Sequence, residues 1–438
     1  MKKSLFKEFI KYSSLSVLGM VGLSCYILAD TFFVSKSLGA DGLTALNIAI
    51  PVYNFISGTG LMLGMGGAIK YAVCKAQERR KDGDRVFTGV MLFAAFFSAF
   101  FVLLGVFFSG QISSLLGAEG RVLPMTQTYM RVMLLFAPAF IFNQVFICFI
   151  RNDSAPRLSM AGMITGSLSN IVLDYVFIFP LDMGIFGAVL ATGFSPLISM
   201  AVMSVHLIKK RNGFHLIRTK PDIKILVSTV KLGFPSLVTE LSSGIVIIVF
   251  NMLILRLAGN NGVAAYGVIA NISLVAVAVF NGIAQGGQPL MSAAFGKGRY
   301  ADSKRLLIFA SVSALILSAV FYSLLYLFDS QIVGIFNSEG NAFLQQTAEK
   351  GVKLYFTALP FAGVNIVFSI FFASVEKALP AHTISILRGL AAIIPIAVVM
   401  SFAFGMTGVW TAFPVTEAAV CAVSLILYIY YNVSFKKA

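Results

Sequence analysis

The sequence has little charge for its length. Only 12% of its 438 residues are Asp, Glu, Lys or Arg, whereas soluble globular domains carry about 25%. With 58% hydrophobic residues and a mean hydropathy of +0.89, the chain has too few polar residues to cover the surface of a soluble domain. A helix needs roughly 20 apolar residues to cross a bilayer. We therefore expect an all-α integral membrane protein without room for a soluble catalytic domain.

The residue types that build enzyme centres are also scarce. The four cysteines lie far apart and the three histidines form no pair with ligand spacing, so neither a disulfide framework nor a metal centre is predicted. The phosphate-binding pattern G-x-x-x-x-G-K-[ST] does not occur in the sequence, which argues against nucleotide hydrolysis. Without a nucleophile near a base, an enzyme is not expected. We predict a carrier driven by an ion gradient and without a cofactor; a membrane-embedded enzyme or a channel is the alternative.

The apolar blocks predict twelve membrane-spanning helices. The predicted spans lie near residues 13–36, 43–73, 86–109, 124–150, 157–180, 184–208, 232–257, 263–291, 306–328, 346–374, 380–404 and 406–432. The net charge of +15 does not indicate nucleic-acid binding, because most of the 33 Lys and Arg residues lie in alternate connections between spans. By the positive-inside rule both termini are then cytoplasmic. We expect a multi-pass protein of the cell inner (cytoplasmic) membrane, with the lipid bilayer as a partner.

An internal repeat divides the chain into two halves. At an offset of 220 residues, Gly39, Gly42, Ala45, Gly66, Gly67, Asp82 and Arg85 match Gly259, Gly262, Ala265, Gly286, Gly287, Asp302 and Arg305. At an offset of 222, Pro138 and Asn143 match Pro360 and Asn365. Each half holds an even number of spans, so both insert in the same direction and are expected to be related by a pseudo-two-fold axis along the membrane normal. We predict two six-helix lobes, 1–208 and 232–438, joined by a cytoplasmic linker over 209–231.

Acidic residues inside the spans are the main functional candidates, because each costs about 2.5 to 3.5 kcal/mol at the centre of a membrane helix. They are Asp30, Asp174, Glu240 and Glu417. Asp30 and Asp174 lie at similar distances from the outer ends of their spans, so they can share one cavity. Both could instead reach the outer interface or satisfy a helix contact. Glu240 and Glu417 could each serve a vestibule or an inter-helix hydrogen bond.

Two polar residues extend the candidate site around the first pair of acids. Asn170 precedes Asp174 by four residues and faces the same way on a helix. Thr192 lies about one turn deeper on the sixth span. Carboxylate, amide and hydroxyl oxygens together can coordinate a hard cation such as Na+ or hold a proton. Asn47 and Asn54 in the second span are secondary candidates, with Glu240 and Glu417, for substrate or cation binding.

Several motifs, in order along nearly the whole chain, resemble the multidrug and toxic compound extrusion (MATE) family. They are Ala29-Asp30-Thr31-Phe32-Phe33-Val34 with Leu38-Gly39 and Pro51; Arg151 to Pro156; Asn170 to Tyr175 with Ile178-Phe179; Gly184 to Ala188 with Ala191-Thr192; and Gly233-Phe234-Pro235 with Gln285-Gly286-Gly287-Gln288-Pro289. Their joint spacing is more specific than any single motif.

The resemblance implies a twelve-helix antiporter that exports organic cations, such as drugs and dyes, in exchange for H+ or Na+. Separately from the resemblance, we expect the protein to be a monomer. The family's N-lobe cation site corresponds here to Asp30, Asn170, Asp174 and Thr192. The sequence departs from some proton-linked members because no proline precedes Asp30 in the first span. It departs from some sodium-linked members because the span near 346–374 has no central acid.

A flippase of lipid-linked precursors is the alternative within the same superfamily. Such cargo carries phosphate and needs basic residues in the cavity. Only Lys70 and Arg256 are expected to approach the spans, whereas acids without an evident partner prevail. The balance of charge inside the spans therefore favours cationic cargo. The 13% of aromatic residues could line a cavity for flat cations, although lipid-facing packing explains any single phenylalanine as well.

Overall fold

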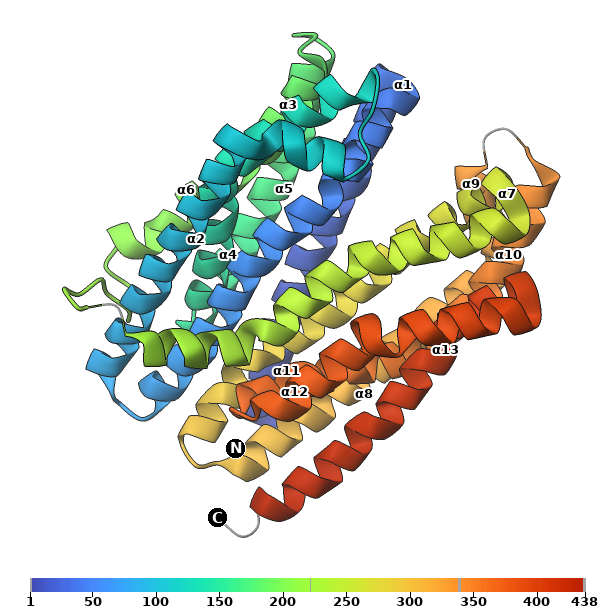
Figure 1. Cartoon of the computed structure of the whole chain (residues 1–438). Coiled ribbons are helices and arrows are strands. Elements are labelled where there is room, and N and C mark those ends of the chain that lie inside the picture. The colour runs from blue at the N-terminus through green and yellow to red at the C-terminus, as the bar shows by residue number, and fades with distance from the viewer. Residues whose placement is uncertain (1, 221, 338–339, 436–438) are drawn as a thin grey trace. The chain divides into compact units, whose positions relative to one another are not determined.

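A computed structural model describes residues 2–220, 222–337 and 340–435, and within these ranges the chain is almost entirely helical (Figure 1). The elements are α1 (Lys2–Ala76), α2 (Arg80–Leu115), α3 (Val122–Leu135), α4 (Ala137–Asn152), α5 (Pro156–Ile178), α6 (Gly184–Ile208), α7 (Ile223–Gly296), α8 (Tyr300–Leu327), α9 (Asp329–Phe336), α10 (Ala342–Tyr355), the 3₁₀ turn η1 (Phe356–Ala358), α11 (Leu359–Ser374), α12 (Ala378–Ile386), the π-helical segment η2 (Leu387–Ala391) and α13 (Ile393–Phe435). The prediction of an all-α protein is confirmed.

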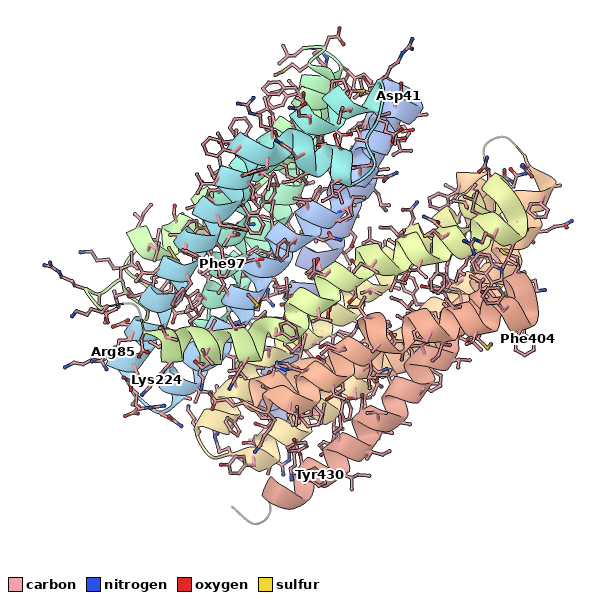
Figure 2. The ribbon with its side chains drawn as sticks, in the orientation of Figure 1. Asp41, Arg85, Phe97, Lys224, Phe404 and Tyr430 are labelled. Carbon is pink, nitrogen blue, oxygen red and sulfur yellow. The ribbon has the colours of Figure 1, made fainter. Side chains whose placement is uncertain are left out.

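Glycine breaks turn three long helical stretches into pairs of spans. Counting the bent pair α3 and α4 as one, the described chain has 9 stretches long and apolar enough to cross a membrane. In α1, α7 and α13, Gly39, Gly259 and Gly405 interrupt the helix with φ of 61°, 62° and 57°, a backbone conformation that favours glycine. The two legs of α13 meet near Phe404 (Figure 2). Each of the three stretches is therefore two spans, which agrees with the twelve predicted.

The fourth and tenth spans are broken at the matched prolines of the repeat. α3 and α4 meet at a bend of 48° beside Phe136, and Pro138 occupies the first turn of α4. In the second half α10 ends at Tyr355, the 3₁₀ turn η1 follows, and Pro360 lies in the first turn of α11. Because proline lacks a backbone N–H, it is tolerated at the start of a helix but interrupts one that continues through it. Both halves thus contain a discontinuous helix at the same place.

Helix α7 begins inside the predicted linker. The carboxylate of Asp222 accepts a hydrogen bond from the backbone N–H of Lys224 at 2.8 Å and caps the helix, which starts at Ile223. The span near 232–257 was predicted from an apolar window, which detects only the apolar part of this helix and misses its polar first turns. The extended connection after α6 is therefore shorter than the 209–231 expected.

The chain forms two compact units. The amino-terminal unit contains Ser14–Leu241 and Ser292–Gly298; the carboxy-terminal unit contains Met1–Ser13, Ser242–Met291 and Arg299–Ala438. These units differ from the predicted lobes in two places. The beginning of α1 belongs to the carboxy-terminal unit, and the beginning of α7 belongs to the amino-terminal unit. Within the amino-terminal unit, Asp41 and Arg85 lie at opposite ends, and Lys224 lies near Arg85 (Figure 2). We call the end that carries Arg85 and Lys224 the basic end.

Glycines let the exchanged helix ends pack closely within each unit. In the amino-terminal unit, a Cβ atom at Gly66 would lie 1.9 Å from the carbonyl oxygen of Thr229, and one at Gly233 would lie 1.8 Å from that of Met62. In the carboxy-terminal unit, a Cβ at Gly286 would lie 2.6 Å from the Cα of Ser13. Gly66 and Gly286 are equivalent in the repeat. Each unit therefore uses the same backbone-to-backbone crossing.

Candidate functional site

The structure brings the predicted cation-site residues together inside the amino-terminal unit. Asp30 lies on the first leg of α1, about two and a half turns before the Gly39 break. Asn170 and Asp174 lie on α5, and Thr192 lies on α6. Asp30 is 7% exposed, Asn170 and Asp174 are 0% exposed and Thr192 is 5% exposed. Three helices thus enclose one buried polar site.

Asn170 links α5 to α6 within this site. Oriented with its nitrogen toward Asp174, the amide donates to Oδ2 of Asp174 at 3.0 Å and accepts from the backbone N–H of Thr192 at 3.3 Å. The Thr192 hydroxyl donates to the carbonyl of Ala188 at 3.0 Å, which leaves its oxygen lone pairs as acceptors. The amide therefore fixes one carboxylate oxygen of Asp174 and leaves the other for a ligand.

Two buried carboxylate oxygens in the site have no hydrogen-bond partner among the described residues. They are Oδ1 of Asp30 and Oδ1 of Asp174. The two carboxylates are close enough for their charges to act on each other. Because a buried charge is costly unless it is paired, two neighbouring carboxylates favour a bound proton or cation. The arrangement can therefore bind a small cation through acceptor oxygens.

Three tyrosines that the sequence did not single out surround these acids. The hydroxyls of Tyr26 and Tyr53 lie 2.9 Å apart. Tyr129 lies beside the Thr192 side chain, and the charges of both Asp30 and Asp174 act on its hydroxyl. Tyr26 precedes Asp30 by one helical turn, so its spacing from Asp30 could have predicted that both side chains lie on the same face of the helix. Tyr129, on α3 before the break in the fourth span, had no such signal.

The secondary candidates of the amino-terminal unit differ in position. Glu240 lies on α7 and packs against α1, where a Cβ on Gly58 would be 3.1 Å from the Cβ of Glu240. Its charge and that of Asp30 both act on the hydroxyl of Tyr53. Asn54 is half-buried on the second leg of α1, whereas Asn47 is exposed. Glu240 thus lies nearer to the acidic site than its distance along the chain indicates.

Glu417 lies in the carboxy-terminal unit, where it forms an ion pair. The guanidinium of Arg388 donates to Oε1 of Glu417 from Nη2 at 2.9 Å and from Nε at 3.2 Å. Arg388 lies in η2, inside the eleventh span. The expectation that only Lys70 and Arg256 approach the spans is therefore wrong. The sequence gives no sign that the turn containing Arg388 is π-helical rather than α-helical.

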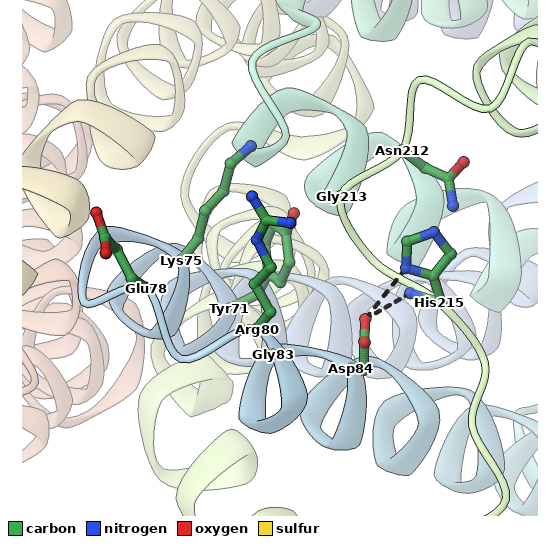
Figure 3. Close-up of a pocket in the computed structure, with 9 residues that line it drawn as sticks. All are labelled: Tyr71, Lys75, Glu78, Arg80, Gly83, Asp84, Asn212, Gly213 and His215. Carbon is green, nitrogen blue, oxygen red and sulfur yellow. Dashed lines mark hydrogen bonds and ion pairs between the residues drawn. The ribbon is translucent and has the colours of Figure 1, made fainter.

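A cavity at the basic end of the amino-terminal unit lies beside the segment that follows α6. It measures about 740 Å³ and is lined by Tyr71, Lys75, Glu78, Arg80, Gly83, Asp84, Asn212, Gly213 and His215 (Figure 3). Figure 3 shows the carboxylate of Asp84 facing the ring and backbone of His215; the backbone N–H of His215 donates to Oδ1 of Asp84 at 2.8 Å. These contacts tie the start of the connection to α2.

Asp153 makes a second tie at the same end. Its Oδ1 accepts from the Tyr71 hydroxyl at 2.6 Å and from Lys75 at 2.5 Å. Its Oδ2 accepts from the backbone N–H of Gly213 at 2.7 Å and lies 2.9 Å from Nε2 of His206. Burial raises the pKa of the Asp153 carboxyl, but these hydrogen bonds outweigh burial and hold the pKa below its ordinary value. Asp153 is therefore an ionised anchor for the connection.

The sequence matches one family model and a group of curated export proteins. Residues 16–176 and 235–413 match the family model described as MatE. The chain is 26% identical over 436 residues to the multidrug export protein MepA of Staphylococcus saprophyticus, covering 98% of this chain and 94% of that protein. It is also 26% identical over 438 residues to MepA of Staphylococcus aureus, with the same coverage. The named relatives are thus export proteins of similar length.

Solved structures share the fold over almost the whole chain. One, described as the outward-facing conformation of a multidrug resistance MATE family transporter of the MOP superfamily, has a TM-score of 0.94 and 22% identity, covering 99% of this chain and 97% of that chain. A MOP superfamily transporter from Pyrococcus furiosus has a TM-score of 0.92 at 22% identity, with the same coverage. At this identity the likeness concerns the fold. It confirms the predicted twelve-helix arrangement in two six-helix halves.

Proposed function

The chain belongs to the MatE family, and from this membership we propose that it is a secondary active efflux antiporter that exports organic cations in exchange for H+ or Na+. The curated relatives are named multidrug export proteins, which supports drugs and dyes as substrates. The protein is a multi-pass membrane protein. No cofactor other than the coupling ion is required by this proposal.

The acidic site of the amino-terminal unit is the observation that carries the proposal. Asp30 and Asp174 each present one buried carboxylate oxygen without a hydrogen-bond partner among the described residues. A proton or Na+ bound there relieves the repulsion between the two charges, and Asn170, Tyr129 and Thr192 complete a shell of polar atoms. Both ions fit this donor set, since oxygen ligands suit a hard cation and a carboxylate accepts a proton.

Exchange follows from competition for the same negative charge. An organic cation and the coupling ion each stabilise the paired carboxylates, so binding of one weakens binding of the other. If each prefers a different conformation of the transporter, their alternating occupancy drives the cycle between outward-open and inward-open states. In this cycle the carboxylates of Asp30 and Asp174 hold the exchanged charge, and Asn170 keeps Asp174 oriented.

We also propose the cellular setting that the sequence predicted. The basic end of the amino-terminal unit faces the cytoplasm of the inner membrane, both termini are cytoplasmic, and the transporter works as a monomer. In this proposal the predicted lobes 1–208 and 232–438 alternate about the connection after α6, which was predicted over 209–231 and which ends where α7 begins at Ile223.

The proposal is tested by efflux of a fluorescent lipophilic cation from proteoliposomes that contain the purified protein. A proton gradient and a sodium gradient are imposed separately, for the wild type and for Asp30→Asn. We expect the wild type to respond to one of the gradients and Asp30→Asn to show only the leak of protein-free liposomes, because the charge that both cations share is lost. Full gradient-driven efflux by Asp30→Asn contradicts the proposed site. Absence of cation movement in the wild type under both gradients would redirect attention to lipid-linked cargo.

A matched pair of threonine variants separates ligation from helix stability in the same assay. Thr192→Val removes the hydroxyl at the site, whereas Thr126→Val removes a buried hydroxyl with the same type of bond, to the carbonyl of Val122 at 2.9 Å. We expect Thr192→Val to raise the coupling-ion concentration for half-maximal efflux about tenfold, as loss of a ligating or orienting group does. Thr126→Val is expected to leave it unchanged.

A further inference from the structure

The carboxy-terminal unit contains a buried network in which every oxygen of an acidic side chain is partnered. Oε1 of Glu417 accepts from Arg388, and Oε2 accepts from the amide nitrogen of Asn365 at 2.7 Å. The same nitrogen lies 2.9 Å from the backbone carbonyl of Glu417, and the Ser424 hydroxyl donates to the Asn365 oxygen at 3.0 Å. The Glu417 side chain is 1% exposed and that of Arg388 is 11% exposed. Glu417 is thus charge-compensated and hydrogen-bonded within its own unit.

The network lies where the helices of this unit depart from regular geometry. Arg388 is in the π-helical segment η2, and π-helical turns are rare and occur frequently at functional sites. Asn365 follows the break between α10 and α11, and Glu417 follows the left-handed Gly405 on the second leg of α13. Tyr355, the last residue of α10, lies within the electrostatic influence of both Glu417 and Arg388. The network therefore links three spans: the ion pair joins the spans of Arg388 and Glu417, and the hydrogen bond from Asn365 adds the span of α11.

The repeat shows that two positions equivalent to residues of the amino-terminal cation site, those of Asp30 and Thr192, are aromatic. Phe250 precedes the Gly259 break by the same number of residues as Asp30 precedes Gly39, and it stacks on Tyr266 with ring centroids 5.4 Å apart. Phe413 follows the left-handed Gly405 as Thr192 follows the left-handed Gly184. The ring of Phe413 stacks on Tyr355 with centroids 4.6 Å apart. Aromatic packing therefore replaces an acid and a hydroxyl of the cation site.

From these observations we propose that ion coupling is one-sided. The amino-terminal unit binds the coupling cation, and Arg388 is a positioning residue that acts as the resident counter-ion of Glu417 and keeps this acid out of ion binding. The inference rests on the proposed function and extends it to the question of a second ion site. The physical contrast lies in hydrogen bonding. Asp30 and Asp174 each have one carboxylate oxygen without a partner among the described residues, whereas both carboxylate oxygens of Glu417 have a partner.

The first test uses a protein whose carboxy-terminal unit is unchanged. In detergent, addition of the lipophilic cation tetraphenylphosphonium displaces the bound coupling ion, which is followed as proton release and as loss of bound radioactive sodium. We expect displacement in the wild type and a loss of at least about tenfold in Asp30→Asn/Asp174→Asn. Displacement that persists in this variant, and disappears when Glu417→Gln is added to it, overturns the inference because Glu417 then binds the coupling ion.

The second test varies the ion pair itself in the proteoliposome efflux assay. Single Arg388→Gln and Glu417→Gln variants leave a buried charge without its partner, so both are expected to lose thermal stability and efflux. The neutral pair Arg388→Gln/Glu417→Gln and the reversed pair Arg388→Glu/Glu417→Arg are expected to recover them. In either recovered pair the coupling-ion concentration for half-maximal efflux should equal that of the wild type. A shift of about tenfold or more assigns the pair to ion binding and contradicts the inference.

The two proposals fail in different ways. If Asp30→Asn retains full gradient-driven efflux, the amino-terminal cation site is wrong whatever the ion pair does. If Asp30→Asn loses efflux but a recovered pair shifts the ion dependence, the cation site stands and one-sided coupling is wrong. If neither pair folds, the displacement measurement on Asp30→Asn/Asp174→Asn still decides the inference, because that protein keeps Arg388 and Glu417.

Discussion

At the scale of single residues, the buried carboxylates of the amino-terminal unit differ in how completely they are hydrogen-bonded. Asp153 has four hydrogen-bond partners, distributed over both carboxylate oxygens. Asp30 and Asp174 each keep one oxygen without a partner among the described residues. A carboxylate saturated by protein donors is a structural anchor, whereas one with a free acceptor in a buried site has affinity for a cation. Burial alone therefore does not identify the functional acids; the completeness of their hydrogen bonding does.

The anchoring role of Asp153 predicts a stability that depends on pH. Because its hydrogen bonds hold the pKa of the folded carboxyl below the ordinary value, the fold favours the ionised form. This stabilisation is complete above the unfolded pKa of about 3.9 and is lost as the pH falls through the lower folded pKa. Asp153→Asn should cost about 2 kcal/mol at pH 7, and its difference from the wild type should shrink below pH 4. Thermal unfolding of the wild type and of Asp153→Asn in detergent, at pH 7 and below pH 4, measures this difference in stability.

A control at the same end of the unit sharpens this comparison. Asp84→Asn weakens the contact with His215, but the Asp84 side chain is 18% exposed against 2% for Asp153. Asp84→Asn should therefore destabilise the fold less than Asp153→Asn, since water can replace the lost partner at the more exposed site. Equal destabilisation by Asp153→Asn at neutral and at strongly acidic pH contradicts an ionised anchor.

The sequence predicted some members of these sites and could not predict others, for a physical reason. Asp30 and Asp174 stood out because an acid in an apolar span is costly, and Asn170 because it lies one helical turn from Asp174. That these residues bind an ion remains a prediction. The pairing of Arg388 with Glu417 joins residues on different spans, and no local spacing encodes such a contact.

At the scale of elements, apolar windows located every span but not the ends of the helices. The window measures the stretch that is free of charge, whereas the backbone continues to form helical hydrogen bonds into polar sequence. Thus α1 starts at Lys2 and α7 at Ile223, each about ten residues before its predicted span. Thr229 lies in these extra turns, and Ser13 and Gly233 lie directly after them; through these contacts each unit acquires the beginning of a helix from the other half of the repeat.

The close crossing of α1 and α7 in the amino-terminal unit predicts a strict requirement for glycine. Gly233→Ala places a methyl group 1.8 Å from the backbone carbonyl oxygen of Met62, and backbone cannot rotate away as a side chain can. We expect destabilisation of about 1 to 3 kcal/mol. Gly267→Ala, on the second leg of α7 and in the carboxy-terminal unit, is the control, because its added methyl meets nothing within 4 Å. It should be neutral or gain up to about 1 kcal/mol from helix propensity.

Thermal unfolding in detergent, read as ligand-free stability, measures both glycine variants. Gly233→Ala should unfold at a lower temperature than the wild type, and Gly267→Ala should not. Wild-type stability of Gly233→Ala is incompatible with a backbone-to-backbone crossing at this position.

At the scale of the whole molecule, composition was sufficient to establish the class of protein, and the repeat was sufficient to divide it into halves. Low charge and high hydropathy require a membrane environment, and the match of Gly39 with Gly259 marks the same helix break in each half. The exchange of helix ends between the compact units was not predictable, because it depends on which long-range packing has the lower free energy. Sequence periodicity reports local faces and carries no information about that choice.

Orientation in the membrane is the remaining property of the whole molecule, and it follows from charge. The segment after α6 carries Lys209, Lys210, Arg211, Arg218 and Lys220, whereas the connection between α2 and α3 carries only Arg121 beside Glu119. The positive-inside rule therefore predicts that the first segment is cytoplasmic and that the second lies outside. In a cysteine-free background on intact cells, Glu119→Cys should react with a membrane-impermeant maleimide, and Lys220→Cys only after permeabilisation. Both side chains are exposed, so reactivity reports the side of the membrane rather than burial. The reverse labelling pattern would place both termini outside and would require the acidic site to be reached from the opposite side during exchange.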